Sequence, residues 1–323
     1  MFIVICFLPS SVLLSRAFLL KFPMFLQQLI NGLTLGSVYA LIALGYSMVY
    51  GILELINFAH GEIYMLGAYL GIIFLAFFTA IGLTAQNLPL SLLLTIILSV
   101  IFCSCYGFTI EKIAYKPLRN APRLSPLISA IGVSIFLQNY VMLTQGATDK
   151  VFPHIFGAAG FQFMSVRMTF LQLFIILISV MLMIALRFFV RKTRMGTAMR
   201  AVAQDKTMAA LLGINIDTII SVTFIIGSGL AAVAGLMVAM YYGLVNYSIG
   251  YIAGIKAFTA AVLGGIGSIR GAMFGGILLG LIESLGGSYI SGEYKDAYAF
   301  IILIIILLIK PGGLFGKAEL EKV

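Results

Sequence analysis

The fold is decided by two stretches that match each other, Ile56-Asn57-Phe58-Ala59-His60-Gly61-Glu62-Ile63 and Val245-Asn246-Tyr247-Ser248-Ile249-Gly250-Tyr251-Ile252. Asn, Gly and Ile coincide in the two octets, and three further positions are conservative. Each octet follows a Tyr-Gly pair that ends a long apolar run, and precedes a segment rich in small residues and two more apolar runs. Eight positions can match by chance, so the repeat needs independent support from topology.

The composition indicates a membrane protein. Apolar residues make up 62% of the 323 residues and charged residues 10%, which is too little polar surface to cover a soluble protein. The formal charge of +9 lies in short clusters between apolar runs, as in loops retained on the cytoplasmic side. No basic face interleaved with stacking aromatics is present, so we expect membrane lipid and no nucleic acid as a partner.

Apolar runs of about 20 residues predict the crossings. The runs cover 25–50, 57–80, 90–112, 125–146, 169–190, 218–241, 255–268, 270–289 and 293–310. Glycines break the stretches 51–71 and 254–271, where a helix is either interrupted at membrane depth or continuous. The sequence therefore predicts an all-α polytopic membrane protein with eight or nine transmembrane helices.

Basic residues give the orientation. With nine crossings, one side collects Lys112, Lys116, Arg119, Arg123, Arg187, Arg191, Lys192, Arg194, Arg200, Lys206, Arg270, Lys310, Lys317 and Lys322. Only Lys150, Arg167 and Lys295 fall in later loops on the other side. This asymmetry places the C-terminus in the cytoplasm and, if the number of crossings is odd, Met24 outside.

The same topology predicts an inverted repeat. The two halves, about 24–146 and 218–310, are separated by the single crossing at 169–190, so the second copy enters the membrane in the opposite direction. In transporters of this architecture, solute sites form near the midplane between the halves.

Residues 1–22 do not fit this plan. They are apolar, but Arg16 and Lys21 follow the apolar run, whereas a signal peptide has its basic residues first. Either the segment is an N-terminal extension or the start is mis-assigned and the chain begins at Met24. The transmembrane domain is expected over 23–323.

The loop at 191–217 is predicted to form a short amphipathic cytoplasmic helix with a left-handed cap at Gly213. Burying large apolar side chains is worth about 1–3 kcal/mol each, so an apolar stripe outside the bilayer favours a protein partner. The alternative is that the stripe packs on loops of this chain or on lipid. The stripe consists of Ala198, Ala201, Val202, Ala209 and Leu212.

This loop carries a family resemblance. Gly196, Arg200-Ala201-Val202-Ala203 and 209–215 resemble the coupling loop of permease subunits of bacterial ABC importers. From Met24 onward the chain resembles LivH-like permease subunits of high-affinity branched-chain amino acid ABC transporters. The motifs that carry the resemblance include 31–37, 56–62, 127–132, 136–140, 256–268 and 293–296.

The resemblance implies a permease of the bacterial inner membrane for leucine, isoleucine or valine. Its implied partners are a second homologous permease, two cytoplasmic ABC ATPase subunits and a periplasmic amino-acid-binding protein. The sequence has no Gly-x-x-x-x-Gly-Lys-Ser/Thr loop, so we expect no enzymatic activity and no bound cofactor, with ATP used by the partners. The residues implied to couple to the ATPase are Gly196, Arg200, Ala201, Asp205, Ala209, Leu212 and Gly213.

Polar residues inside the spans are candidates for the translocation path, because an ionisable group there costs at least about 2.5 kcal/mol. On the octet alignment, Glu62 and Lys256 fall in equivalent segments and can pair across the midline; alternatively each ends a helix and reaches water. The candidates are Asn57, His60, Glu62, Gln138, Asn139, Asn246 and Lys256.

Other functions are less well supported. The only other histidine, His154, lies in an outside loop, and Cys6, Cys103 and Cys105 have no ligand spacing, so no metal site or disulfide is expected. Two rivals remain: a secondary transporter in which Glu62 or Glu283 carries a proton, and a channel or assembly component.

Overall fold

The computed structural model describes residues 10–119, 121–122, 124–153, 155–157, 159–163 and 166–316, with side chains from Phe22 onward. His154, Arg123, Lys317 and Lys322 lie outside the described residues, as do residues 1–9 of the predicted N-terminal extension.

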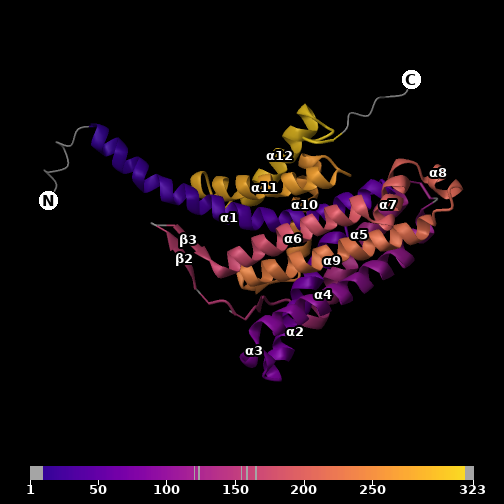
Figure 1. The fold of residues 1–323 in the computed structure, drawn as a ribbon, viewed down its shortest axis with the longest axis horizontal. Helices are drawn as coiled ribbons and strands as arrows, with labels where there is room; N and C mark the ends of the chain where they lie inside the picture. The colour runs from indigo at the N-terminus through magenta and orange to yellow at the C-terminus, as the bar shows by residue number, and fades with distance from the viewer. Residues whose placement is uncertain are drawn as a thin grey trace.

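The described chain is almost entirely helical (Figure 1). The main helices are α1 (Ser10–Leu53), α2 (His60–Ala80), α4 (Leu88–Ile110), α5 (Leu124–Gln145), α6 (Phe170–Lys192), α9 (Ile216–Tyr242), α10 (Ile249–Gly264), α11 (Ile269–Tyr289) and α12 (Lys295–Ile309). The short elements are α3 (Leu83–Gln86), η2 (Glu111–Tyr115), η3 (Lys116–Leu118), α7 (Arg194–Gln204) and α8 (Lys206–Leu211), with strands β1 (Lys150–Val151), β2 (Gly160–Phe163), β3 (Val166–Thr169) and β4 (Leu244–Val245). The all-α prediction is confirmed.

Within the described residues, seven helices are long and apolar enough to cross a membrane. The remaining two predicted crossings correspond to α10, with 16 residues, and α12, with 15. At 1.5 Å per residue these helices reach only about 24 Å and 22 Å, less than the roughly 30 Å hydrocarbon core. The eight or nine crossings predicted from apolar runs are therefore seven long helices and two short ones.

Helix packing obeys the predicted repeat. α1 packs on α11 and α9 packs on α4; α2 packs on α9 and α10 packs on α1. In the same way, the pairs α2–α4 and α2–α5 have counterparts in α10–α11 and α10–α12. Each contact maps onto its counterpart when α1, α2, α4 and α5 are matched with α9, α10, α11 and α12, so the four-helix repeat is present in three dimensions.

The two halves run in opposite directions. α1 ends beside α8, where Lys206 Nζ lies 3.8 Å from Glu54 Oε1, and α9 begins a few residues after α8. We call this the α8 end of the molecule. At the opposite end β1, which follows α5, pairs antiparallel with β4, which follows α9. Since the end of α1 lies beside the beginning of α9, the equivalent helices are antiparallel and the inverted topology is confirmed.

The matched octets form equivalent breaks. The segments 54–59 and 243–248 are not helical, and the next helix begins at the aligned positions His60 and Ile249. The His60 amide donates to the Asn57 carbonyl at 3.0 Å, and the Ile249 amide donates to the Asn246 carbonyl at 3.3 Å. The helix interruption predicted within 51–71 is confirmed, and a second predicted interruption lies between α10 and α11.

The aligned glycines of the octets, Gly61 and Gly250, touch each other. A Cβ added to Gly250 would lie 2.7 Å from the Gly61 carbonyl oxygen, and one added to Gly61 would lie 2.8 Å from Gly254 Cα, closer than atoms pack. Contact between equivalent positions places them on the pseudo-two-fold axis. Glycine is needed here because the backbones of α2 and α10 approach too closely for a side chain.

We expect Gly61→Ala to lower the free energy of unfolding by about 1–3 kcal/mol, because the added methyl overpacks this contact. The measurement is SDS titration of the protein in mixed micelles. Gly132→Ala is the matched control: Gly132 also lies within a helix, and no atom lies within 4 Å of its added Cβ. Equal stability of the two variants would contradict the close contact.

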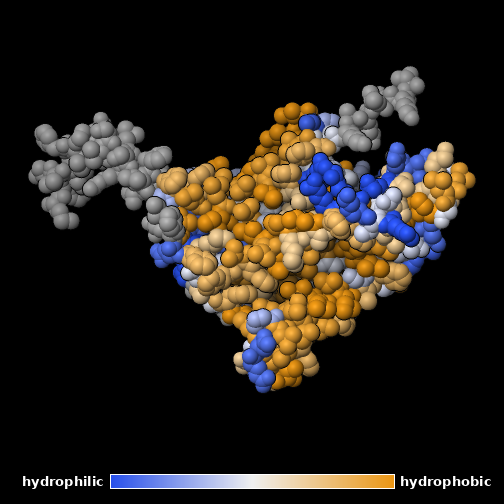
Figure 2. All heavy atoms as spheres, in the orientation of Figure 1, coloured by the Kyte–Doolittle hydropathy of each residue, from blue (hydrophilic) through white to orange (hydrophobic). Residues whose placement is uncertain are grey.

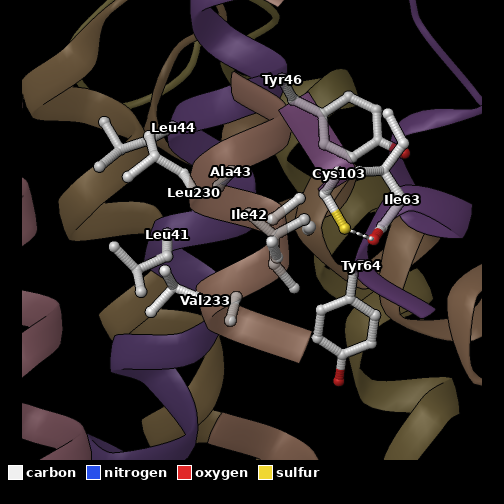
Figure 3. Packing of buried hydrophobic residues seen from close by; sticks show 14 of the residues in the cluster. Leu41, Ile42, Ala43, Leu44, Tyr46, Ile63, Tyr64, Cys103, Leu230 and Val233 are labelled. Atoms are coloured by element: carbon white, nitrogen blue, oxygen red, sulfur yellow. Dashed lines mark hydrogen bonds between the residues drawn. The ribbon is translucent and has the colours of Figure 1, made fainter. Parts of the chain in front are cut away.

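The centre of the bundle is formed by α1 and α9, whose most apolar 18-residue windows are 89% and 83% buried, compared with 22% for α5. Tyr46, Ile63, Tyr64 and Leu230 belong to one buried hydrophobic cluster there, part of which Figure 3 shows. The surface is broadly apolar, with hydrophilic residues gathered largely near α7 and α8 (Figure 2). Such a surface suits a multi-pass membrane protein.

Candidate functional site

A buried charged cluster joins α1, α10, α11 and α12. Lys256 Nζ lies 2.8 Å from Glu283 Oε1 and 2.6 Å from Asp296 Oδ1. The Tyr39 hydroxyl donates to Glu283 Oε2 at 2.8 Å and lies 3.4 Å from the Lys256 ammonium. The side chains of Lys256 and Glu283 are 9% and 4% exposed, whereas that of Asp296 is 56% exposed. The cluster therefore has a buried side and an open side.

A cavity of about 240 Å³ lies beside this cluster. Its walls combine four aliphatic side chains with three tyrosines, Asn246, and the opposite charges of Lys256 and Asp296. Pockets for small polar ligands commonly combine apolar walls with a few placed polar groups. The aliphatic and aromatic residues of the wall are Leu35, Val238, Ile249, Ile252, Tyr39, Tyr64 and Tyr242, and Ala253 also lines the cavity.

Of the two alternatives for Glu62 and Lys256, the salt bridge between them is wrong, because Lys256 pairs with Glu283 and Asp296. Glu62 Oε1 instead accepts a hydrogen bond from Ser134 Oγ at 3.1 Å, and Glu62 Oε2 has no hydrogen-bond partner in the part of the chain that the structure describes. The two residues are not at aligned positions: Glu62 lies on the first turn of α2, while Lys256 lies in the middle of α10 and turns towards α11 and α12.

The other predicted path residues fall into three places. Asn246 and Lys256 line the cavity. Asn57, His60 and Glu62 are buried around the break before α2, where the Tyr115 hydroxyl donates to Asn57 Oδ1 at 2.7 Å. The last two lie on α5: Gln138 is half-buried, and Asn139 is exposed and bonds to the Ile135 carbonyl.

Two features of the cavity were missed from the sequence. Its three tyrosines belong to different helices and look like ordinary core aromatics along the chain. Asp296 lies in the first turn of α12, where an acidic residue stabilises the helix N-terminus. Its presence there is explained without a partner, so the sequence did not reveal its pairing with Lys256.

The predicted single amphipathic helix at 191–217 is two helices, α7 and α8. Thr193 caps α7 by accepting from the Gly196 amide at 3.0 Å, and Asp205 caps α8 by accepting from the Met208 amide at 2.9 Å. An Asp side chain that caps a new helix favours a break over helix continuation. The predicted cap at Gly213 is confirmed, with φ of 80° in the left-handed region.

The predicted apolar stripe is divided between this chain and the surface. Val202 and Ala209 are buried within the chain, and Ala198 and Ala201 are half-buried, so α7 packs on its own subunit. Leu212 remains 79% exposed, and two residues outside the predicted stripe, Met208 and Leu211, are 60% and 77% exposed. The exposed apolar surface is therefore on α8.

The remaining predicted coupling residues surround these helices. Gly196 packs against the backbone of Phe189 and Val190. Arg200 and Asp205 are exposed, and Arg200 Nη2 donates to Thr197 Oγ1 at 3.2 Å.

An ion-pair network joins the end of α4 to the beginning of α9. Arg119 contacts both Glu111 and Asp217, and Lys116 Nζ lies 2.7 Å from Asp217 Oδ2. Glu111 is fully buried in the π-helical η2 and also accepts from Ser221 Oγ at 2.8 Å. The network holds the α4–α5 connection to the base of α9, next to α8.

The family model and the similar proteins that match this chain all describe the same kind of protein. The family model described as "Branched-chain amino acid transport system / permease component" matches residues 28–307. The chain is 50% identical over 307 residues to the high-affinity branched-chain amino acid transport system permease protein LivH of Escherichia coli (strain K12), covering 94% of this chain and 99% of the relative.

Two further relatives carry the same description. The chain is 50% identical over 305 residues to the permease protein BraD of Pseudomonas aeruginosa, covering 93% of this chain and 98% of BraD. It is 27% identical over 299 residues to the probable branched-chain amino acid transport permease protein LivH of Methanocaldococcus jannaschii, covering 87% of this chain and 89% of that protein. No solved structure matches the chain.

Proposed function

This chain belongs to the family of permease components of branched-chain amino acid transport systems, and we propose that it carries leucine, isoleucine and valine across the bacterial inner membrane as the permease subunit of an ABC importer. The observation that carries the proposal is 50% identity along nearly the whole of the LivH and BraD permeases. The inverted repeat supports it, because such repeats build alternating-access transporters.

Energy comes from separate subunits in this proposal. The sequence has no phosphate-binding loop of the Walker type, so the chain binds no nucleotide cofactor and its two ATPase partners use the ATP. A second homologous permease completes the membrane part, and a periplasmic binding protein delivers the amino acid. The clustering of basic residues in the loops supports a cytoplasmic position of the α8 end.

We propose that α8 is the docking point for an ATPase subunit. Met208, Leu211 and Leu212 form an exposed apolar group at the α8 end, where water or headgroups would otherwise surround them. Burial of large apolar side chains in a partner is worth about 1–3 kcal/mol each, enough to anchor a short helix. Arg200 and Asp205 add exposed charges beside it.

The double variant Leu211→Ser/Leu212→Ser is expected to reduce ATP-driven leucine uptake about tenfold or more, because losing roughly 1.4 kcal/mol of docking energy is already a tenfold loss. Uptake is measured in membrane vesicles supplied with ATP and the binding protein, with the proton gradient collapsed. Ile290→Ser is the control, since Ile290 is 78% exposed but follows α11 at the opposite end. Membrane abundance should be normal in both variants.

Two outcomes would count against this proposal. Normal uptake by the Leu211/Leu212 variant would remove α8 as the coupling site. Uptake that stops when the proton gradient collapses, while ATP is present, would favour a secondary transporter. Gly213→Ala is a second test of the α8 end, because the positive φ of this residue strains any side chain. Gly82→Ala is its control, since it introduces the same strain, with φ of 79°, in the α2–α3 turn.

A further inference from the structure

We infer that the cavity beside Lys256 is a binding site for a zwitterionic α-amino acid with an aliphatic side chain, and that the Lys256–Asp296 ion pair opens to receive it. The inference rests on the proposed function and assigns that function a site in this subunit. Lys256 Nζ would bind the carboxylate of the solute, and Asp296 would bind its ammonium group.

The ammonium of Lys256 has two buried partners on its inner side and Asp296 on its outer side. Glu283 and Tyr39 contact it from within the bundle, and both are buried, at 3% and 5% exposed. Because the Tyr39 hydroxyl also bonds to Glu283, this inner contact is fixed and keeps the ammonium at the cavity wall when its outer partner leaves.

Asp296 is the exchangeable partner. Its side chain is 56% exposed, and ion pairs with solvent access contribute only about 0–1 kcal/mol. A carboxylate arriving from the cavity can therefore replace Asp296 on Lys256 at little cost. Asp296 then faces the solute with a free carboxylate, which matches the ammonium carried by the same molecule.

The N-terminus of α10 adds a second interaction for the carboxylate. Asn246 and Ile249, which precede and begin the helix, both line the cavity, so the first turn of a 16-residue helix borders it. The partial positive charge of a helix N-terminus stabilises an anion. Here it acts together with a buried lysine, which gives the site one positive side.

The remaining wall suits an aliphatic side chain. Leu35, Val238 and Ile252 present only hydrocarbon, and the faces of the tyrosines add further apolar area. Each methylene moved from water onto such a wall gains about 0.8 kcal/mol. A larger aliphatic side chain should therefore bind better than that of glycine or alanine.

Charge balance restricts the ligand class. A zwitterion brings one positive and one negative group, so Lys256 and Asp296 both remain paired after the exchange. Leucinamide lacks the carboxylate and leaves Lys256 with one partner fewer; 4-methylpentanoate lacks the ammonium and leaves Asp296 unpaired. Both analogues keep the aliphatic chain, so they separate charge recognition from apolar burial.

The test is protection of a cysteine at the cavity mouth. Tyr242 ends α9, lines the cavity and is 54% exposed, so Tyr242→Cys should react with a water-soluble maleimide in a Cys6→Ser/Cys105→Ser chain. Labelling is followed in membranes that contain the full transporter. L-leucine at about ten times its dissociation constant is expected to slow labelling about tenfold, whereas leucinamide and 4-methylpentanoate have little effect.

Ile290→Cys is the control, since it is exposed near the same end but does not line the cavity. Adding Asp296→Asn should abolish the protection at position 242. Any of three results would overturn the inference: leucine does not slow labelling at position 242, either analogue protects that position as well as leucine does, or leucine protects position 290 equally. ATP-driven uptake by the wild-type chain, measured in parallel, tests the proposed function separately, so uptake without protection rejects the cavity alone.

Discussion

Lys256→Met is expected to lower the free energy of unfolding by about 3–5 kcal/mol, because it leaves the carboxylate of Glu283 charged and unpaired inside the bundle. Glu283 is only 3% exposed and, among the described residues, would keep the Tyr39 hydroxyl as its hydrogen-bond partner. The loss is measured by SDS titration in mixed micelles, and membrane abundance should fall with it.

The double variant Lys256→Met/Glu283→Gln separates the buried charge from the volume of the side chain. It removes both charges, and replacing a whole buried ion pair is often neutral, so much of the stability should return. Asp296→Asn should cost less than about 1 kcal/mol, because that partner is exposed. If the double variant is no more stable than Lys256→Met, the unpaired Glu283 is not the cause.

The fold was largely predictable because helices that cross a membrane need long runs of apolar residues, which are easy to recognise in the sequence. Apolar runs mark the helices, and the octets mark equivalent breaks, which the structure confirms at His60 and Ile249. Helix length was less accessible: the apolar run at 255–268 predicted a crossing, but the helix covers Ile249–Gly264, because Gly265 adopts a φ of 105° and ends it. Local backbone conformation at a glycine is not visible in hydropathy.

The charged cluster was only partly predictable. The free-energy cost of an ionisable side chain inside the membrane singles out Lys256 and Glu283 individually. The octet alignment, however, suggested Glu62 as the partner of Lys256. Alignment of two repeats shows which backbone positions are equivalent, and it contains no information on the direction of side chains on different helices. The partners from α11 and α12 follow from three-dimensional packing alone.

The loop at 191–217 shows a competition between two local preferences. Helical spacing of apolar residues favoured one continuous helix, while Asp205 favours a cap. The cap prevails, and the new helix axis turns Leu211 and Leu212 outward while Val202 stays in the core. The periodic pattern therefore located the loop and the exposed Leu212 correctly, but it missed Met208 and Leu211 and included Val202 and Ala209, which are buried.

Arg119→Met should be as damaging as the loss of Lys256, about 3–5 kcal/mol, because it strips the main cationic partner from Glu111. Glu111 is fully buried, and the nearest remaining cation among the described residues, the Lys112 ammonium, lies 3.7 Å away, beyond hydrogen-bonding distance. The Ser221 hydroxyl, which donates to Glu111 Oε2 at 2.8 Å, would remain as a hydrogen-bond partner of the carboxylate. The network also connects the base of α9, directly after α8, to the α4–α5 connection, so we expect the variant protein that folds to show reduced ATP-driven uptake.

Lys116→Met is the matched comparison within the same network. Its partner Asp217 is 45% exposed and keeps its contact with Arg119, so the stability should change by less than about 1 kcal/mol. Both variants remove one positive charge from the same few residues and differ in whether the abandoned carboxylate is buried. A large loss of stability for Arg119→Met and a small one for Lys116→Met would show that the buried Glu111 accounts for most of the stability of this junction. Equal losses would mean that net charge at the α8 end, and not burial of Glu111, governs the junction between α4 and α9.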